Sequence, residues 1–223
     1  MNILAVDTAL GACSAVLLNG DEILARRFQL MERGHAEALA PMVDALLREA
    51  AVSFAAIDRL AVTVGPGTFT GQRVGLAFMR GLRLALRKPL VGVTTLSAMA
   101  HQATAETGLP LAAALHDARR GEVYFGLRDG AHDVIAASIA PLENAVAQIA
   151  AVTGGRPIAL AGTAGPAAGA LFDARGMKAK LSAVRVPDAL YVAMLAQHAP
   201  EPASVPRPLY LRPSDARLPE PRP

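Results

Sequence analysis

Short apolar runs separated by turn residues open the chain, and a helical pattern follows them. Residues 3–7, 14–18 and 22–30 have the pattern of strands joined by short turns, which predicts an antiparallel meander. From His35 to Ala51, apolar side chains recur at intervals of three and four residues, the spacing of an amphipathic helix. The pattern therefore predicts a small sheet followed by a helix.

Strands and helices alternate in the next part of the chain. Apolar runs at 60–64 and 90–93 predict two buried strands, and each is followed by a helical pattern. The first of these helices is expected to have Thr68 or Thr70 as its N-cap, and the second is expected to be capped near Thr95. This alternation is typical of α/β folds.

The opening pattern recurs in the second half of the chain. Residues 111–117 and 122–127 form a second hairpin pattern, whose first strand ends in Asp117 as the first strand of the chain ends in Asp7. This recurrence predicts two lobes of related topology. The expected divisions are 1–103 for the first lobe, 104–199 for the second, and 200–223 for a proline-rich strap and tail.

The rest of the second lobe follows the same alternation. Its remaining elements are expected to be a strand at 134–139, a helix at 143–152, a strand at 158–161, a short helix, and a last helix at 188–199. After Pro200 the density of proline predicts an extended segment that lies outside the core. Beyond Leu218 we expect disorder.

The segment from Val62 to Gly75 combines a strand end, a glycine-rich turn and a helix start. Gly65 and Gly67 flank Pro66, so the backbone can approach another body closely there. A P-loop would need Lys and then Ser or Thr after its last glycine, and these residues are absent. The dinucleotide fingerprint would need two residues between its second and third glycines, whereas three residues separate Gly67 from Gly71. A packing connection and a partner contact both remain open.

Composition narrows the class of protein. The 223 residues are 52% hydrophobic with a formal net charge of +3, which is typical of a folded globular protein. No apolar run is long enough to span a membrane, and Met1 leads directly into a strand, so we expect a cytoplasmic protein without membrane contact. The single cysteine, Cys13, excludes an internal disulfide, and the absence of Trp argues against a base-stacking platform.

Three segments carry a more specific signal, together with the helix pattern His35-Ala-Glu-Ala-Leu-Ala-Pro-Met42. They are Gly65-Pro-Gly-Thr-Phe-Thr-Gly-Gln-Arg-Val-Gly75, Asp117-Ala-Arg-Arg-Gly-Glu-Val-Tyr124, and Pro208-Leu-Tyr-Leu-Arg212 with Asp215-Ala216. In this order they resemble the signatures of the bacterial TsaB family, also called YeaZ. The strand-Asp-turn-strand opening of each lobe resembles the actin, sugar kinase and Hsp70 (ASKHA) superfamily. The resemblance implies a two-lobed ASKHA-like α/β fold with mixed sheets flanked by helices.

The resemblance also implies a function. Members of this family take part in making N6-threonylcarbamoyladenosine (t6A) next to the anticodon of tRNAs, as non-catalytic scaffold or activator subunits. The resemblance implies pairing with a TsaD-like catalytic subunit and a TsaE-like ATPase, and a homodimer when the chain is alone. It implies contact with tRNA only through the complex. It implies no intrinsic cofactor, and it leaves room for ATP or ADP at the partner interface.

Histidine positions bear on the non-catalytic interpretation. In TsaD-like chains, the strand that follows the glycine motif leads into a helix with a His-x-x-x-His pair. This spacing places two imidazoles on one helix face, where they can bind a metal. The corresponding positions here are Thr95 and Met99, which supply no imidazole. His101 is isolated, and His116 beside Asp117 lacks a third partner. We therefore predict no catalytic residue and no metal-binding residue.

Two adjacent helices are predicted to dock the partner, because small and apolar helix faces can form half of a four-helix interface. Gly71 and Gly75 stand four residues apart and hence on one helix face, which predicts a bare surface. The alternative is that these faces pack on the sheet of their own lobe. The predicted partner contacts are Leu39, Met42, Leu46, Gly71, Arg73, Val74, Gly75 and Phe78.

Two enzyme hypotheses stand beside the scaffold. A phosphotransferase or other nucleotide-binding enzyme of the same superfamily is suggested by the aspartate turn and by the loop from Gly162 to Gly165. A metallopeptidase is disfavoured by the missing histidines. The residues predicted to contact a nucleotide are Asp7, Thr8, Gly65 and Gly67.

Overall fold

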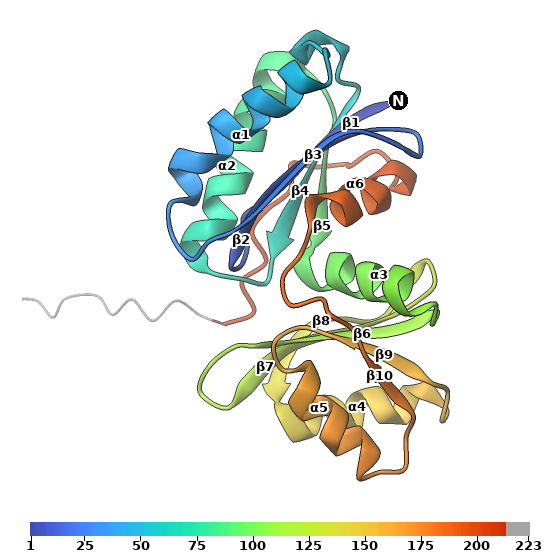
Figure 1. Ribbon diagram of the computed structural model, residues 1–223. Coiled ribbons are helices and arrows are strands. Elements are labelled where there is room, and N and C mark those ends of the chain that lie inside the picture. Colours follow the sequence, from blue (N-terminus) through green and yellow to red (C-terminus); the bar gives the residue numbers. More distant parts are fainter. Residues whose placement is uncertain (213–223) are drawn as a thin grey trace, which may run out of the picture.

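The computed structural model describes residues 1–212, and their strands form two five-stranded mixed sheets (Figure 1). The first sheet has the order β3-β2-β1-β4-β5, with β1 (Asn2–Asp7), β2 (Ala12–Asn19), β3 (Glu22–Leu30), β4 (Arg59–Gly65) and β5 (Leu90–Thr94). The second has the order β8-β7-β6-β9-β10, with β6 (Leu111–Asp117), β7 (Glu122–Asp129), β8 (His132–Pro141), β9 (Ile158–Ala161) and β10 (Ala179–Leu181). The orders match strand for strand, which confirms the predicted relation between the halves.

Each sheet joins an antiparallel meander to parallel strands. β1 pairs antiparallel with β2 and parallel with β4, and β6 does the same with β7 and β9. Asp7 and Asp117 stand at the ends of β1 and β6, as the recurring pattern predicts. The sequence does not predict β10, because its three residues are too few to show an alternating pattern.

Six α-helices connect these strands in residues 1–212. They are α1 (His35–Glu49), α2 (Phe69–Leu86), α3 (Thr95–Thr107), α4 (Leu142–Thr153), α5 (Gly165–Asp173) and α6 (Ala189–His198), with a short 3-10 turn at Phe54–Ala56. The Thr68 side chain accepts a hydrogen bond from the Gly71 N–H and caps α2, which decides between the two predicted positions, Thr68 and Thr70. Thr94 caps α3 through the Ser97 N–H, one residue before the expected position.

The elements stack in layers, which Figure 1 shows from α1 and α2 at one end to α4 and α5 at the other. α1 and α2 bury leucines such as Leu46 and Leu76 against the outer face of the first sheet. α4 and α5 bury Ile149 and Phe172 against the outer face of the second. The inner faces of the two sheets are covered by α6 and α3, which lie between them. Among the described helices, none is long and apolar enough to cross a membrane.

The two inner helices are exchanged between the halves of the chain. α3 follows β5 of the first sheet, yet it packs Leu96, Met99 and Ala103 against alanines of β6 and β9 in the second sheet. α6 follows β10 of the second sheet and packs Val192 and Ala193 against β1 and β2 of the first. Neither lobe is therefore a continuous stretch of sequence, and a division after residue 103 falls inside α3.

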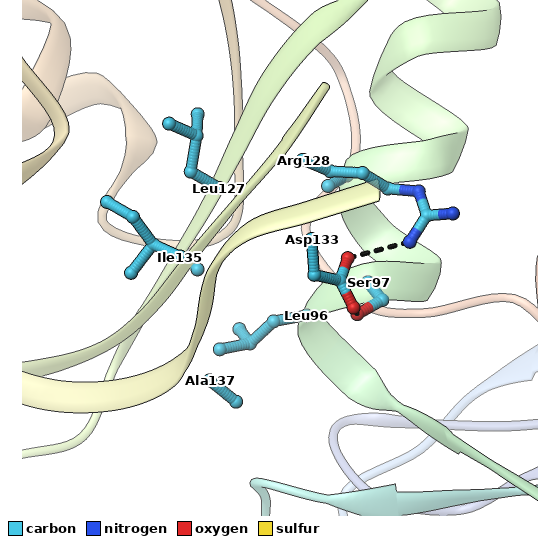
Figure 2. Close-up of a pocket in the computed structure, with 9 residues that line it drawn as sticks. Leu96, Ser97, Leu127, Arg128, Asp133, Ile135 and Ala137 are labelled. Atoms are coloured by element: carbon cyan, nitrogen blue, oxygen red, sulfur yellow. Dashed lines mark hydrogen bonds and ion pairs between the residues drawn. The ribbon is translucent and has the colours of Figure 1, made fainter. Parts of the chain in front are cut away.

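A polar network around the buried Arg128 ties α3 to the second sheet (Figure 2). Arg128 of β7 is only 8% exposed. Its guanidinium donates to Asp133 Oδ1 and to the Ala131 carbonyl, each at 2.6 Å. Ser97, near the start of α3, donates its hydroxyl to Asp133 Oδ2 at 2.9 Å. The cavity beside these groups measures only about 10 Å³. Arg128 is thus closely packed, whereas the Asp133 side chain that pairs with it is 39% exposed.

The segment after α6 returns along the first lobe as an extended strap, as the proline content predicts. The Leu209 N–H donates to the Val64 carbonyl at 2.7 Å. At its end, Arg212 donates to the Ala118 carbonyl at 2.7 Å and forms an ion pair with Glu122 in the β6–β7 hairpin. The strap thereby joins the first lobe to the second. The expected tail beyond Leu218 and the Asp215-Ala216 part of the signature lie outside the described residues.

Replacing Asp133 by Ala is expected to lower the free energy of unfolding by about 1–3 kcal/mol, because the buried Arg128 guanidinium loses its carboxylate and Ser97 loses its acceptor. Asp129→Ala is the matched control, since it breaks an ion pair with Arg156 that is more exposed and should cost about 0.5 kcal/mol. Urea unfolding measures both. Equal losses would show that the network contributes no more than a surface pair.

Candidate partner-docking site

The glycine turn between β4 and α2 lies against the turn between β1 and β2. Gly65 has φ 107°, and a side chain there would place Cβ 2.6 Å from Oε1 of the buried Gln72. Gly67 needs no positive φ, but a Cβ would collide with the Ala9 carbonyl, which also accepts the Thr68 N–H at 2.8 Å. Close packing inside the lobe therefore explains both glycines.

Asp7 and Thr8 are enclosed by the same packing. The Thr8 hydroxyl donates to the Gly71 carbonyl at 2.7 Å, and Asp7 Oδ1 accepts from the Thr63 hydroxyl at 2.6 Å and the Ala9 N–H at 3.2 Å. Both residues are no more than 1% exposed. Asp7 and Thr8 therefore expose almost no surface to a nucleotide in this conformation. A nucleotide contact through Gly65 and Gly67 stays a prediction.

Burial has an electrostatic consequence for Asp7. Desolvation raises its pKa from 3.8 to about 7, the nearby Asp188 carboxylate adds to the rise, and the hydrogen bonds from Thr63 and Ala9 oppose it. Oδ2 has no hydrogen-bond partner among residues 1–212. A carboxyl group in this setting is held largely in its neutral form at mildly acidic pH.

The glycines of α2 do not form the predicted docking surface. A Cβ on Gly71 would collide with the Thr8 carbonyl, and a Cβ on Gly75 would lie 2.7 Å from Thr8 Oγ1 and 3.4 Å from Val62. Both glycines thus face β1 and β4 rather than solvent. The prediction that they contact a partner is wrong, because the four-residue spacing defines a common face but not the direction in which that face points.

Two predicted contacts on α1 are also buried. Leu39 and Leu46 are at most 1% exposed and belong to the core between α1 and the first sheet. They cannot contact a partner while the lobe is folded. Met42, Val74 and Phe78 are partly exposed and pack at the margin of the same core, and their role in docking stays a prediction.

The outward face of α2 carries residues that were not among the predicted contacts. Ala77 and Gly81 are exposed, and a Cβ on Gly81 would meet no atom within 4 Å. They are spaced four residues apart, like Gly71 and Gly75, so the periodic signal existed but did not distinguish outside from inside. We call the exposed apolar strip of these helices the α1/α2 surface; it consists of Met42, Val74, Ala77, Phe78 and Gly81.

Arg73 holds the strap in place. Its guanidinium carbon lies 3.5 Å from the centroid of the Phe69 ring, and its Nε donates to the Tyr210 hydroxyl at 2.9 Å. The rings of Phe69 and Tyr210 stack with centroids 5.4 Å apart. The Leu-Tyr-Leu-Arg part of the signature therefore anchors the strap to α2 through Tyr210 and to the second lobe through Arg212.

The positions that hold an imidazole pair in TsaD-like chains lie inside the fold. Thr95 and Met99 of α3 are fully buried. His101 packs edge-on against Tyr191, and burial lowers its pKa, as it does for His116. Among the described residues no group of three His, Cys, Asp or Glu side chains is placed to hold a metal ion.

Comparison with known proteins identifies the family. A family model for TsaD, tRNA N6-adenosine threonylcarbamoyltransferase, matches residues 28–212. The TsaB protein of Escherichia coli, a tRNA threonylcarbamoyladenosine biosynthesis protein, is 42% identical over 56% of this chain and 54% of its own length. YeaZ from Pseudomonas aeruginosa has a TM-score of 0.77 at 34% identity, covering 94% of this chain and 99% of that one. The chain belongs to the TsaB (YeaZ) family.

The extent of these similarities differs. The chain spans about half the length of the curated TsaB relatives from E. coli and Haemophilus influenzae, whereas the match to YeaZ covers nearly all of both chains. Component A of the (R)-2-hydroxyglutaryl-CoA dehydratase from Acidaminococcus fermentans, with a TM-score of 0.53 and 11% identity, shares the fold alone. The predicted two-lobed ASKHA fold of the TsaB family is thereby confirmed.

The raised pKa of Asp7 predicts a pH dependence of stability. Because the folded pKa is about 7 and an unfolded aspartate titrates near 3.9, the folded state retains a proton between these values that the unfolded state has released. The contribution of Asp7 is therefore fully present below about pH 4 and is lost as pH rises to about 7. Between about pH 5 and 8 the loss should reach about 2–3 kcal/mol.

Asp7→Asn tests this assignment, because a neutral amide cannot titrate. Urea unfolding at several pH values should show a decrease for the unsubstituted chain that is absent from the variant. Parallel pH profiles of the two proteins would mean that Asp7 is not the titrating group.

The two kinds of α2 glycine predict opposite effects of the same substitution. Gly75→Ala is expected to lower the free energy of unfolding by about 1–3 kcal/mol, because the methyl group meets Thr8 and Val62 in the core. Gly81→Ala should raise it by about 0.5–1 kcal/mol through helix propensity, since the new methyl group enters open space. Thermal and urea unfolding measure both changes, and a harmless Gly75→Ala would contradict the close packing of Gly75 against Thr8.

Proposed function

We propose that this chain is a non-catalytic subunit in the formation of t6A in tRNA, where it pairs with and activates a TsaD-type transferase. The observation that carries the proposal is the combination of a TsaD family match over residues 28–212 with buried Thr95 and Met99 at the positions of the imidazole pair. The E. coli relative is named as a tRNA threonylcarbamoyladenosine biosynthesis protein, which supports the same process.

The α1/α2 surface supports pairing between related subunits. Its side chains are small or apolar, and it lies on the two helices that cover the outer face of the first sheet. Two such helix pairs can pack face to face as a four-helix arrangement. The proposed occupant is the equivalent helix pair of the TsaD-type subunit, or a second copy of this chain when that subunit is absent.

The remaining partners follow from the proposed complex. A TsaE-type ATPase would join the pair, tRNA would reach this chain through the assembly, and ATP or ADP would bind at the boundary between subunits rather than at Asp7. The phosphotransferase alternative is not proposed, because the Asp7 carboxyl and the Thr8 hydroxyl are both buried and engaged inside the lobe.

A reconstituted modification reaction tests the function. Unmodified tRNA is incubated with the TsaD-type and TsaE-type proteins and a source of threonylcarbamoyl-adenylate, with or without this chain, and t6A is measured by nucleoside mass spectrometry. Omission of the chain is expected to reduce t6A to background. Equal yields with and without it would reject the proposal.

Ala77→Arg tests the docking surface, because a charged side chain would separate closely packed helices while it points away from its own core. Association with the TsaD-type subunit, measured by sedimentation, is expected to be lost with little change in the Tm of the isolated chain. Ala147→Arg places the same side chain at an exposed position of α4 and should leave association intact. Normal pairing of Ala77→Arg would remove the α1/α2 surface from consideration.

A further inference from the structure

A groove of about 370 Å³ lies between the C-terminal end of α2 and the first part of the strap. One side is formed by the α2–β5 connection and the other by residues 201–204. Three of its lining side chains are the cations Arg83, Arg87 and Lys88, and Glu201 is the one acidic residue that lines it. We call this feature the arginine groove.

The cations of the arginine groove are free of competing partners. Within residues 1–212, the side chains of Arg83, Arg87 and Lys88 form neither hydrogen bonds nor ion pairs. Arg80, one turn earlier on α2, donates to the Pro206 carbonyl and so fastens the strap that forms the opposite wall. The groove thus combines a fixed wall with three cationic groups that remain available to an external anion.

Charge is also arranged along the length of α2. Arg73 and Arg80 stand seven residues apart, about two helical turns, and therefore share one flank of α2. Arg87 follows seven residues later, as the C-cap of the same helix. No Asp or Glu occurs anywhere from Phe69 to Lys88. Val74 and Phe78 lie on the opposite flank, next to α1. A line of cations without carboxylates matches an extended polyanion better than a single small anion.

Arg87 adopts a backbone conformation that glycine usually occupies. Arg87 ends α2 in the left-handed region at φ 55°, where α3 and α4 end in Gly108 and Gly154. A residue with a Cβ is strained in this conformation, and glycine is preferred there. The helix dipole favours a cation in the last turn, but it does not require that arginine occupy the left-handed position. Ala51, just after α1, has a similar φ of 52°, so this strain is not confined to the groove. It does offer a substitution, Arg87→Gly, that separates stability from binding.

We propose that the arginine groove binds the sugar–phosphate backbone of RNA directly, so that this chain itself contributes contacts to the tRNA that the assembly holds. The proposal rests on the proposed function for the choice of RNA as the polyanion. Arginine and lysine contacts to phosphate position a nucleic acid without reading its sequence, which suits a subunit that would hold the substrate of a partner. The low aromatic content of the chain, 4% with no Trp, fits backbone contacts rather than base stacking.

The direct test measures binding of a fluorescently labelled, unmodified tRNA transcript to the full chain by anisotropy, from about 50 to about 200 mM salt. The triple variant Arg83→Gln, Arg87→Gln, Lys88→Gln should bind at least about 10-fold more weakly at about 100 mM salt, and its slope of log K against log salt should be shallower by about 2. The control variant carries the same three neutralisations at exposed cations of the second lobe, which are Arg175, Lys178 and Lys180.

A single substitution separates binding from folding. Arg87→Gly removes a cation but relieves the left-handed backbone, so it should weaken RNA binding while it raises the Tm by about 2–4 °C. A variant that is more stable and yet binds less tightly cannot owe its defect to unfolding.

Several results would overturn the proposal. They are the absence of measurable RNA binding by the unsubstituted chain, equal losses in the two triple variants, and unchanged RNA affinity of the groove variant. If the groove variant keeps its affinity for RNA but no longer associates with the TsaD-type protein, the groove would be assigned to an acidic protein segment. The t6A assay separates this proposal from the proposed function. If t6A formation requires this chain but proceeds normally with the groove variant, only the role of the groove is rejected. If the chain binds RNA through the groove but t6A forms equally well without the chain, only the proposed function is rejected.

Discussion

The exchange of α3 and α6 is the packing constraint on which the rest of the molecule depends. Both faces of each sheet are apolar and must be covered by helices. Here the inner face of each sheet is covered by a helix from the other half of the chain. Polar contacts fix both exchanged helices. Ser97 binds Asp133 at the start of α3, and the Ser14 hydroxyl of β2 accepts the Ala189 N–H of α6 at 2.9 Å. The two lobes are therefore one structural unit, and the strap reinforces the connection through Arg212.

The glycine motif serves this architecture from within. Gly65, Gly67 and Gly71 allow the turn after β4 to press against the turn after β1, and the space where a cleft would begin is filled by protein groups. Asp7 is consequently desolvated, which accounts for its high pKa. Asp117, at the same place in the second lobe, is exposed and accepts the Arg119 N–H at 2.8 Å. Equivalent positions in the two halves thus have opposite electrostatic environments.

Helix α2 separates three kinds of interaction around its circumference. The glycine face packs on the sheet, one flank with Val74 and Phe78 adjoins α1, and the other flank carries arginines beside the strap. The helix can hold the lobe together, dock a related subunit and contact a polyanion without one role obstructing another. This division of the helix surface connects the fold to both proposals.

Local and periodic features were readable from the sequence. The order of elements other than β10, a threonine cap at 68 or 70, the recurrence of the hairpin and the extended strap all depend on residues close together in the chain. The direction of each helix face was not readable: Gly71 and Gly75 share the spacing of Ala77 and Gly81, yet only the first pair is buried. Burial is decided by segments far away in sequence, here Thr8 and Val62. For the same reason, the exchange of α3 and α6 and the groove between α2 and the strap were decided only by the tertiary structure.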